Sequence, residues 1–397
     1  MKQKVAIVGG GPSALMLAAT LDFSKFEVSV YEQNKTLGRK FLVAGDGGFN
    51  LTHGSDIELM KQQYHPSGFL DKTLETFSNQ DLRNWLRSLG IETFVGSSNR
   101  VYPIKGIKPI QVLNAILQKL EENKVKICTQ MQWNGWKGNN DLLFNETEVV
   151  KADIVIFALG GSSWSVTGSR GTWLPYFQKK GIATLPFQAS NCAFKVDWQS
   201  EFIDKYNGFP LKNISLTLGN HSVKGELVVT KFGLEGNAIY ALSRVIQNEL
   251  KQHGQATVYL DLKPMFELEQ IIEKLKQVKS KNTSEALKMG LNFSPMQIQL
   301  IKQSISKEDY VEIDKLAERI KSLPISLLYA APIDEAISTT GGIAIEEVDE
   351  NFQLKALPNH YIIGEMLDWD APTGGYLLQA CMSMGVVLGK RLNEIIH

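Results

Sequence analysis

Short apolar runs alternate with glycine-rich turns near the amino terminus. Residues 5–8 form a β-branched run, and residues 27–31 form a second strand-like run that ends at Glu32. Between them, residues 15–19 have the composition of a buried helix. A β-branched run without polar alternation is typical of a strand buried on both faces of a parallel sheet. The pattern therefore predicts a strand–helix–strand unit.

Two further apolar runs that end in glycine lie in the middle and near the end of the chain. Residues 153–159 predict a buried strand that runs into a Gly-Gly pair, and residues 361–363 predict a strand that stops at Gly364. A long apolar helix is expected over residues 376–388. Both ends of the chain thus show the strands and helices of an α/β domain.

The interior of the chain has a different pattern. Alternating runs predict strands at residues 192–196, 214–218, 225–230 and 257–260, with a helix near 238–250. Apolar positions at helical spacing follow over residues 266–323. We expect a discontinuous doubly wound domain (1–190 plus 331–397), a β-rich, barrel-like insertion (191–262) and a small helical insertion (263–330).

Composition narrows the class of protein. The 397 residues include 42 Lys plus Arg and 42 Asp plus Glu, and 43% are hydrophobic. This balance excludes a disordered chain or a uniformly basic nucleic-acid coat, and no run reaches the ~20 apolar residues of a membrane span. The 3 cysteines and 6 histidines show no metal-ligand spacing, so we expect no metal and a cytoplasmic location.

The amino-terminal turn has the spacing of a dinucleotide-binding motif. Gly9 permits a tight turn, Gly11 lets a pyrophosphate approach the backbone, and Ala14 is small enough for close packing of helix on strand. Glu32 would accept hydrogen bonds from a ribose 2′-hydroxyl, which favours FAD or NAD over NADP. The alternative is a glycine turn in an ordinary α/β protein. We also assign Pro12, Ser13 and Gln33 to this cofactor site.

Features far from this turn favour FAD. A strand closing on Gly364-Glu365, followed by a glycine-led helix, resembles the second FAD fingerprint of glutathione-reductase-type flavoproteins. That resemblance implies that Glu365 binds the ribityl chain and that the helix amino terminus faces the flavin. Residues 158–160 resemble another element of the same flavoproteins. The cofactor residues assigned on these grounds are Ala158, Leu159, Gly160, Gly364, Glu365, Thr373, Gly374, Gly375 and Tyr376, together with Met131.

Residues 38–52 resemble the signature of the BaiN/RdsA-like FAD flavoproteins, also called aminoacetone-oxidase-like. Weaker similarities continue in order over nearly the whole chain, at 100–103, 225–230 and 340–343. The family usually has Arg-Cys where this chain has Gly48-Phe49, so a thiol beside the flavin is lost. The resemblance adds Arg39, Lys40, Gly45, Asp46 and Gly47 to the expected cofactor residues.

The resemblance implies an FAD-dependent oxidoreductase that is reduced by transiently bound NAD(P)H and passes a hydride to an unidentified small or planar substrate. Cationic side chains would anchor an anionic group of the substrate, and Tyr102 could donate a proton. The substrate-side residues we predict are Asn50, Arg100, Tyr102, Lys105, Arg170 and Lys231.

Two other functions are kept as hypotheses. Residues 274–307 hold seven lysines against one acid, and residues 100–126 hold six basic residues against two acids, while residues 334–370 are acidic. Such basic runs are usually solvated helical faces, but they could also bind RNA in a flavin-dependent, dihydrouridine-forming rRNA enzyme. The loss of the family cysteine also admits a flavin-binding module without catalysis.

Overall fold

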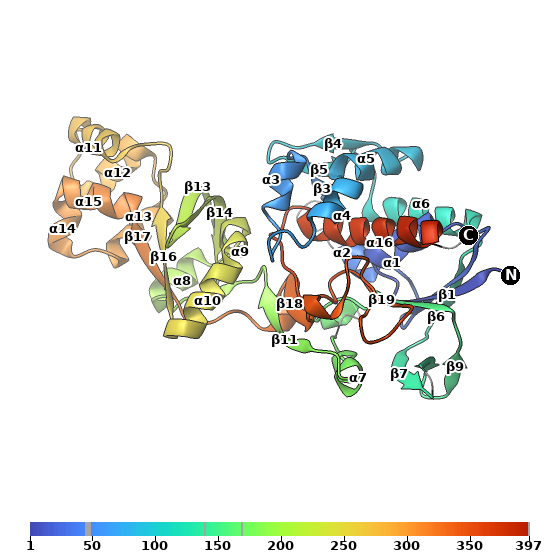
Figure 1. Cartoon of the computed structure of the whole chain (residues 1–397). Helices are drawn as coiled ribbons and strands as arrows, with labels where there is room; N and C mark the ends of the chain where they lie inside the picture. The colour runs from blue at the N-terminus through green and yellow to red at the C-terminus, as the bar shows by residue number, and fades with distance from the viewer. Residues whose placement is uncertain (44–48, 139, 168–169, 396–397) are drawn as a thin grey trace. The chain divides into compact units, whose positions relative to one another are not determined.

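The computed structural model describes residues 1–43, 49–138, 140–167 and 170–395, and the chain forms two compact units. Unit 1 comprises Met1–Ala189 and Ile337–His397, and unit 2 comprises Ser190–Ala336. Unit 1 therefore contains both ends of the chain, coloured blue and red in Figure 1. The chain leaves unit 1 through β11 (Thr184–Ser190) and returns through its partner strand β18 (Ser338–Ile343).

A five-stranded parallel sheet organises unit 1. Its order is β19-β10-β1-β2-β6, and all neighbours run parallel. The strands are β1 (Gln3–Val8), β2 (Phe26–Glu32), β6 (Lys126–Thr129), β10 (Ile154–Phe157) and β19 (His360–Ile362). The chain order reverses beside β1, so the carboxyl ends of β1 and β10 flank the crevice where this fold class binds ligands. The expected α/β fold with a parallel sheet is confirmed.

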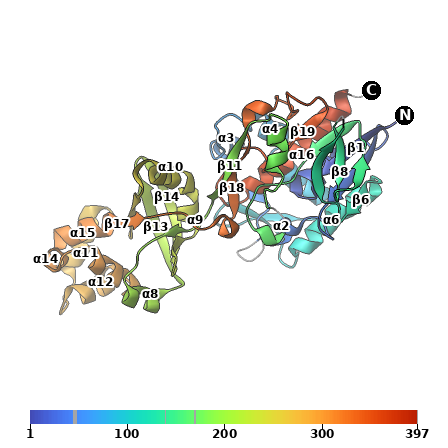
Figure 2. The ribbon, with the colours of Figure 1, turned by 90° about the horizontal axis from the view of Figure 1, so that it is seen from below.

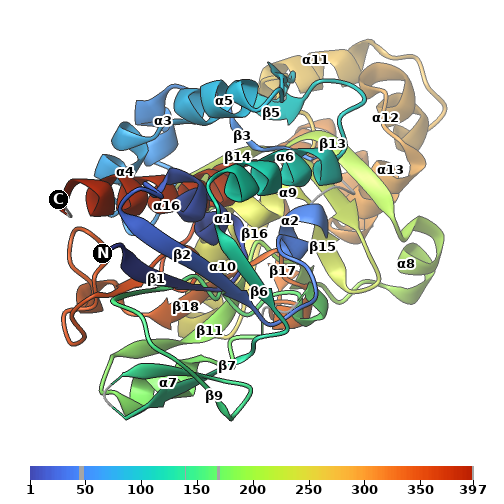
Figure 3. The same ribbon diagram turned by 90° about the vertical axis from the view of Figure 1, so that its right-hand side faces the viewer.

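Both faces of this sheet are covered. Helices α1 (Pro12–Thr20), α6 (Pro109–Glu122) and α16 (Tyr376–Ile395) lie on one face (Figure 3). The other face carries an antiparallel meander of β7 (Trp133–Lys137), β8 (Asp141–Phe144) and β9 (Glu148–Val150). Side chains alternate along each strand, so Ile156 faces the helices while Phe157 contacts Trp133 of the meander.

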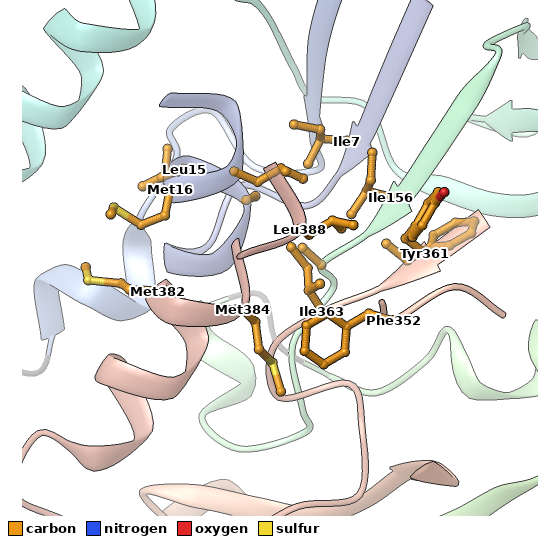
Figure 4. Close-up of a cluster of buried hydrophobic side chains, with 14 of the residues drawn as sticks. Ile7, Leu15, Met16, Ile156, Phe352, Tyr361, Ile363, Met382, Met384 and Leu388 are labelled. Atoms are coloured by element: carbon orange, nitrogen blue, oxygen red, sulfur yellow. The ribbon is translucent and has the colours of Figure 1, made fainter. Parts of the chain in front are cut away.

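Helices α1 and α16 pack very closely. Figure 4 labels Leu15 and Met16 of α1 and Met384 and Leu388 of α16 in one buried cluster, and all four are almost fully buried. Two glycines of α16 make this approach possible. A Cβ at Gly385 would lie 2.3 Å from the Ser13 carbonyl oxygen, and one at Gly389 would lie 2.8 Å from Cβ of Thr20. The start of α1 is thus fixed by a helix from the other end of the chain.

Smaller elements complete unit 1. Strands β3 (Thr52–His53), β4 (Thr93–Val95) and β5 (Arg100–Pro103) form an antiparallel sheet in the order β3-β5-β4. Helices α3 (Ile57–Lys61), α4 (Asp71–Thr76) and α5 (Asn79–Ser88) belong to the same region, and α4 packs on α16. The short helices α2 (Arg39–Val43) and α7 (Leu174–Lys179) follow β2 and β10, respectively.

Unit 2 is built on an antiparallel sheet of order β12-β15-β14-β13-β16-β17. Its strands are β12 (Phe194–Lys195), β13 (Phe209–Leu218), β14 (His221–Val229), β15 (Gly233–Glu235), β16 (Ala256–Asp261) and β17 (Leu323–Leu327). The chain just after β17 returns to β12, where the Lys195 amide donates to the Tyr329 carbonyl at 2.8 Å. Hydrogen bonds therefore link the two ends of the sheet, as a barrel requires.

The helices of unit 2 fall into two groups. Helix α8 (Ser200–Tyr206) lies near the sheet, as do α9 (Asn237–Ala241) and α10 (Ser243–His253). The sequence predicted a single helix near 238–250, and the structure has α9 and α10 there instead. Helices α11 (Leu268–Gln277), α12 (Thr283–Leu291), α13 (Pro295–Gln303), α14 (Lys307–Val311) and α15 (Ile313–Lys321) gather beyond β17 (Figure 2). That the β-rich and helical parts are separate domains stays a prediction.

His360 on β19 is expected to make the stability of the protein depend on pH. The imidazole is 7% exposed, and its Nδ1 hydrogen-bonds the Pro358 carbonyl at 2.9 Å. Burial lowers the pKa of His360 from its ordinary 6.5, and the Lys180 ammonium lowers this pKa further. The unfolded chain therefore binds more protons than the folded chain below about pH 6.5, and the free energy of unfolding falls as the pH drops through this window.

Urea unfolding between pH 5 and pH 8 checks this expectation. His360→Asn, which can keep a hydrogen bond to Pro358, should flatten the loss of stability below pH 6.5, whereas the same change at the exposed His221 should not. Equal slopes in the three proteins would contradict the assignment.

Candidate functional site

A cleft opens at the carboxyl ends of the central strands of unit 1, where α1 begins. It encloses about 1040 Å³ of space free of protein atoms, including its open mouth. The cleft is lined by the β1–α1 turn, the end of β2, the start of α2 and the chain that follows β6 and β10. Residues 363–365 and Cys381 of α16 complete the lining.

The β1–α1 turn presents backbone to this cleft. Gly9 has φ +109°, and a Cβ there would lie 2.3 Å from the Ala158 carbonyl oxygen, so only glycine fits between the two strands. Gly11 differs, because it has an ordinary φ of −82° and a Cβ there would meet no atom within 4 Å. No side chain of the described residues caps the helix that starts at Pro12. The free peptide N–H groups and the positive end of α1 suit an anion such as a pyrophosphate.

Glu32 is fixed at the end of β2. Its Oε2 accepts from the Gly10 amide at 2.8 Å, and its Oε1 accepts from the amide and the side chain of Asn34 at 2.8 and 2.7 Å. Asn34 in turn accepts from the Arg39 guanidinium at 2.6 Å. A carboxylate held in this way beside the glycine turn can accept hydrogen bonds from ribose hydroxyls.

An ion pair joins two distant motifs in the same cleft. The Lys40 ammonium lies 3.0 Å from Oε2 of Glu365 and donates to the Ser163 hydroxyl at 2.6 Å. The other oxygen of Glu365 accepts from the Thr339 amide at 3.1 Å. This group of donors and acceptors can hydrogen-bond a polyol such as a ribityl chain, and the role of Glu365 there stays a prediction.

Cys381 of α16 also lines this part of the cleft. Burial and the neighbouring Glu365 carboxylate raise the pKa of its thiol to about 12. The thiol is therefore protonated at neutral pH and is a poor nucleophile. Phe49, which stands where the family has cysteine, is 7% exposed and packs edge-to-face on Phe41 with ring centroids 4.9 Å apart.

The cleft brings together most of the predicted cofactor residues. Those that line it are Gly9, Gly11, Pro12, Ser13, Glu32, Gln33, Arg39, Lys40, Met131, Ala158, Leu159, Gly160, Gly364 and Glu365. Ala14 is fully buried behind the turn, where it packs rather than binds. Thr373, Gly374, Gly375 and Tyr376 lie outside the lining, at the amino terminus of α16. Gly45, Asp46 and Gly47 lie outside the described residues.

The predicted substrate-side residues are spread over more than one place. Only Arg170 lines the cleft. Arg100 and Tyr102 are on β5, Lys105 follows that strand, and Asn50 precedes β3. Lys231 belongs to unit 2 and lies between β14 and β15. The roles of all six residues stay predictions.

Several lining residues were not predicted from the sequence. Asn34 supports Glu32, and its position two residues after the acid was a usable local signal. Trp173 is buried, lines the cleft and donates from Nε1 to the Gly160 carbonyl at 3.1 Å. Ser163 hydrogen-bonds Lys40, and Thr339 hydrogen-bonds Glu365. No local sequence pattern predicts these two contacts.

A model of a known protein family, the HI0933-like protein Rossmann domain, matches residues 3–391. The chain belongs to this family. The family resemblance found in the sequence is therefore confirmed. Family and fold together place the chain among the FAD-dependent oxidoreductases, and the cleft residues fit the pyrophosphate, ribose and ribityl parts of that cofactor.

Two relatives match nearly the whole chain. A 3-dehydro-bile acid delta(4,6)-reductase of Clostridium scindens is 24% identical over 98% of this chain and 99% of its own length. A ribosomal RNA dihydrouridine synthase of Haemophilus influenzae is 23% identical over 94% of each chain. The structure of 3-ketosteroid-delta4-(5alpha)-dehydrogenase from Rhodococcus jostii superposes with a TM-score of 0.51 at 13% identity, covering 98% of this chain and 96% of that one, which shows a shared fold.

Among the described residues, no helix has both the length and the apolar character needed to cross a membrane.

Proposed function

We propose that this chain is an FAD-dependent oxidoreductase whose flavin is reduced by NAD(P)H and passes a hydride to a small or planar organic substrate. The observation that carries the proposal is the cleft in which the glycine turn and Glu32, from one end of the chain, meet Glu365 from the other. An extended dinucleotide with a ribityl chain needs binding groups at both places.

The proposed roles follow from the chemistry of each group. The amides at the start of α1 bind the pyrophosphate, Glu32 binds the adenosine ribose, and Glu365 binds the ribityl hydroxyls. Arg39 and Lys40 add positive charge where the phosphates would lie. Bound FAD supplies hydride transfer chemistry, and the protein supplies orientation and charge.

A planar substrate is supported by the relatives. One is named for a bile acid, and a structural neighbour was determined with 4-androstene-3,17-dione. Within this chain, Arg100, Lys105 and Arg170 are the cations proposed to anchor an anionic group of the substrate.

Anaerobic titration with NADH and NADPH tests the proposal. The purified protein, loaded with FAD, is expected to lose its flavin absorbance near ~450 nm when either nicotinamide is added, because hydride transfer reduces the ring. Reoxidation by a panel of steroids and RNA then identifies the class of acceptor. A protein that binds FAD but is not bleached would be a flavin-binding module without this activity, and one that binds no FAD would contradict the proposal outright.

A flavin-dependent rRNA-modifying enzyme is the second candidate, and the charge of unit 2 favours it. Within the described residues, none of the seven lysines over 274–307 forms an ion pair with a carboxylate, although Lys274 lies 4.9 Å from the ring centre of Phe266. Unpaired lysines can bind phosphates, and a relative is named for rRNA. Filter binding to rRNA should then weaken steeply between 50 and 200 mM salt on the order of 10³-fold for six or more phosphate contacts. No binding at low salt excludes this candidate.

A further inference from the structure

Two neighbouring cations at the start of α2 contact the chain that follows β10. The Arg39 guanidinium donates to the Val166 carbonyl at 3.0 Å, and the Lys40 ammonium donates to the Ser163 hydroxyl at 2.6 Å. We call residues 163–167 the strap. Helix α2 thus holds the strap at two points, each through a charged side chain.

The place of the strap in the fold takes these contacts across the cleft. Strand β1 lies between β10 and β2 in the parallel sheet, and the glycine turn follows β1. Because α2 follows β2 and the strap follows β10, a bridge from α2 to the strap spans the end of β1. Arg39 and Lys40 line the cleft, as does Thr167 at the end of the strap. The two cations therefore help to enclose the space at the glycine turn.

Apart from these cations, little holds the outer part of the strap. Within the described residues, the bond from Arg39 is the only hydrogen bond that joins residues 164–167 to another segment. The amide and hydroxyl of Thr167 donate to the Trp164 carbonyl at 2.9 and 2.8 Å, inside the strap itself. Trp164 has φ +55°, a strained conformation for a bulky residue. Such strain persists where contacts on both sides fix the backbone, and it is typical of ligand clamps.

The α2 end of the bridge is fixed more firmly. The Gly38 amide donates to the Gly10 carbonyl at 2.9 Å, which ties the start of α2 to the glycine turn. The Arg39 guanidinium also donates to Oδ1 of Asn34 at 2.6 Å. The planar fork of this side chain therefore joins Asn34 to the strap, and the strap is the part that can move.

We infer that Arg39 and Lys40 form a clasp that holds the strap across the cofactor cleft and sets the rates at which FAD enters and leaves. This inference rests on the proposed function, in which the cleft binds FAD. The bond from Arg39 to Val166 joins protein to protein, so it must break whenever the strap opens, for entry as for exit. Its strength therefore acts on both rates and largely cancels from the affinity.

Arg39→Lys tests the clasp because it keeps the positive charge and removes the planar fork. Uptake and release of FAD should both become at least ~10-fold faster, the scale of one hydrogen bond from a charged group, while the dissociation constant changes far less than either rate. Stopped-flow flavin fluorescence of the apoprotein mixed with FAD measures uptake. Transfer of FAD from the holoprotein to an excess of apo-glucose oxidase measures release.

Further variants separate the clasp from simple attraction of phosphate. A cation that only attracted phosphate would give slower uptake and faster release when its charge is lost. With the clasp, Arg39→Gln should still take up FAD faster at ~0.5 M salt, where attraction between exposed charges is screened. Ser163→Ala removes one acceptor of Lys40 and leaves both cations in place, so it should also speed up both rates.

Arg83 of α5 offers a matched control. Its guanidinium also joins two segments, by donating to Thr93 at 3.1 Å and to Gln80 at 3.2 Å, but it does not line the cleft. Arg83→Lys should therefore leave uptake and release of FAD unchanged.

Hydrogen exchange observes the strap directly. The backbone amides of residues 163–167 should exchange faster in Arg39→Lys than in the unchanged protein, both with and without added FAD, because the strap opens more often. This measurement does not depend on the cofactor.

The clasp is overturned if Arg39→Lys takes up and releases FAD at the unchanged rates, or if its uptake becomes slower while release becomes faster. Unchanged exchange of the strap in Arg39→Lys also overturns it. Failure of the unchanged protein to bind FAD contradicts the proposed function instead, and hydrogen exchange then still decides whether Arg39 holds the strap.

Discussion

A Gly11→Val variant is expected to fold normally and to bind FAD at least ~100-fold more weakly than the unchanged protein, a loss of about 2.7 kcal/mol. The backbone at Gly11 has φ −82°, which valine tolerates, and a Cβ would meet no protein atom within 4 Å. The added side chain therefore fills only the space in which a pyrophosphate would approach the start of α1. Fluorescence titration of the apoprotein with FAD measures the affinity, and thermal unfolding measures the fold.

Two neighbouring substitutions show whether the effect is specific. Gly11→Ala adds less volume and should cause a smaller loss of affinity at an unchanged melting temperature. Gly9→Ala should instead destabilise the protein, because its Cβ meets the Ala158 carbonyl at 2.3 Å. Affinity of the Gly11→Val protein equal to that of the unchanged protein would show that the cofactor does not cross this turn.

Gly385→Ala in α16 is expected to lower the free energy of unfolding by about 3 kcal/mol, the upper end of the usual cost of overpacking. Helix propensity alone predicts the opposite sign, since alanine stabilises a helix interior by ~1 kcal/mol relative to glycine. Packing decides here, because the new Cβ would lie 2.3 Å from the Ser13 carbonyl oxygen and 2.9 Å from the Leu17 amide nitrogen. Backbone atoms of a buried helix cannot move aside as a flexible side chain can.

Thermal or urea unfolding measures the change, which corresponds to a melting temperature lower by roughly 6–12 °C for a unit of this size. Lys390→Ala, at an exposed position of the same helix, is the matched control and should change stability by less than ~0.5 kcal/mol. A Gly385→Ala protein more stable than the unchanged one would mean that α1 and α16 are not in close contact.

Local motifs made the amino-terminal half of the cleft predictable. The spacing of Gly9, Gly11 and Glu32 follows from one turn between two neighbouring strands, so the sequence carries the geometry. The carboxyl-terminal fingerprint at Gly364 was recognisable for the same reason. Both motifs lie in unit 1 of the structure.

Contacts between distant segments were not predictable. Lys40 and Glu365 were each assigned to the cofactor, but they are 325 positions apart, so their ion pair depends on how the chain between them returns to the sheet. Trp173 reaches Gly160 only because of where α7 lies, and His53 stacks on Tyr376 only because the small sheet packs near α16. The sequence predicted one helix near 238–250, but the structure has a break at Leu242 between α9 and α10. The apolar periodicity continues through Leu242, so the sequence pattern gave no sign of this break.

The insertion of unit 2 between β11 and β18 also has a consequence for biosynthesis. The glycine turn and Glu32 are translated before unit 2, whereas Glu365, Cys381 and α16 are translated after it. Since α16 also covers the apolar face of α1, this face of α1 stays exposed while unit 2 is translated and folds. Continuous domains fold in turn as they emerge, whereas unit 1 closes only after unit 2 has been translated. The nascent chain is therefore expected to need chaperone protection of α1, and the cofactor cleft is complete only once α16 has been made.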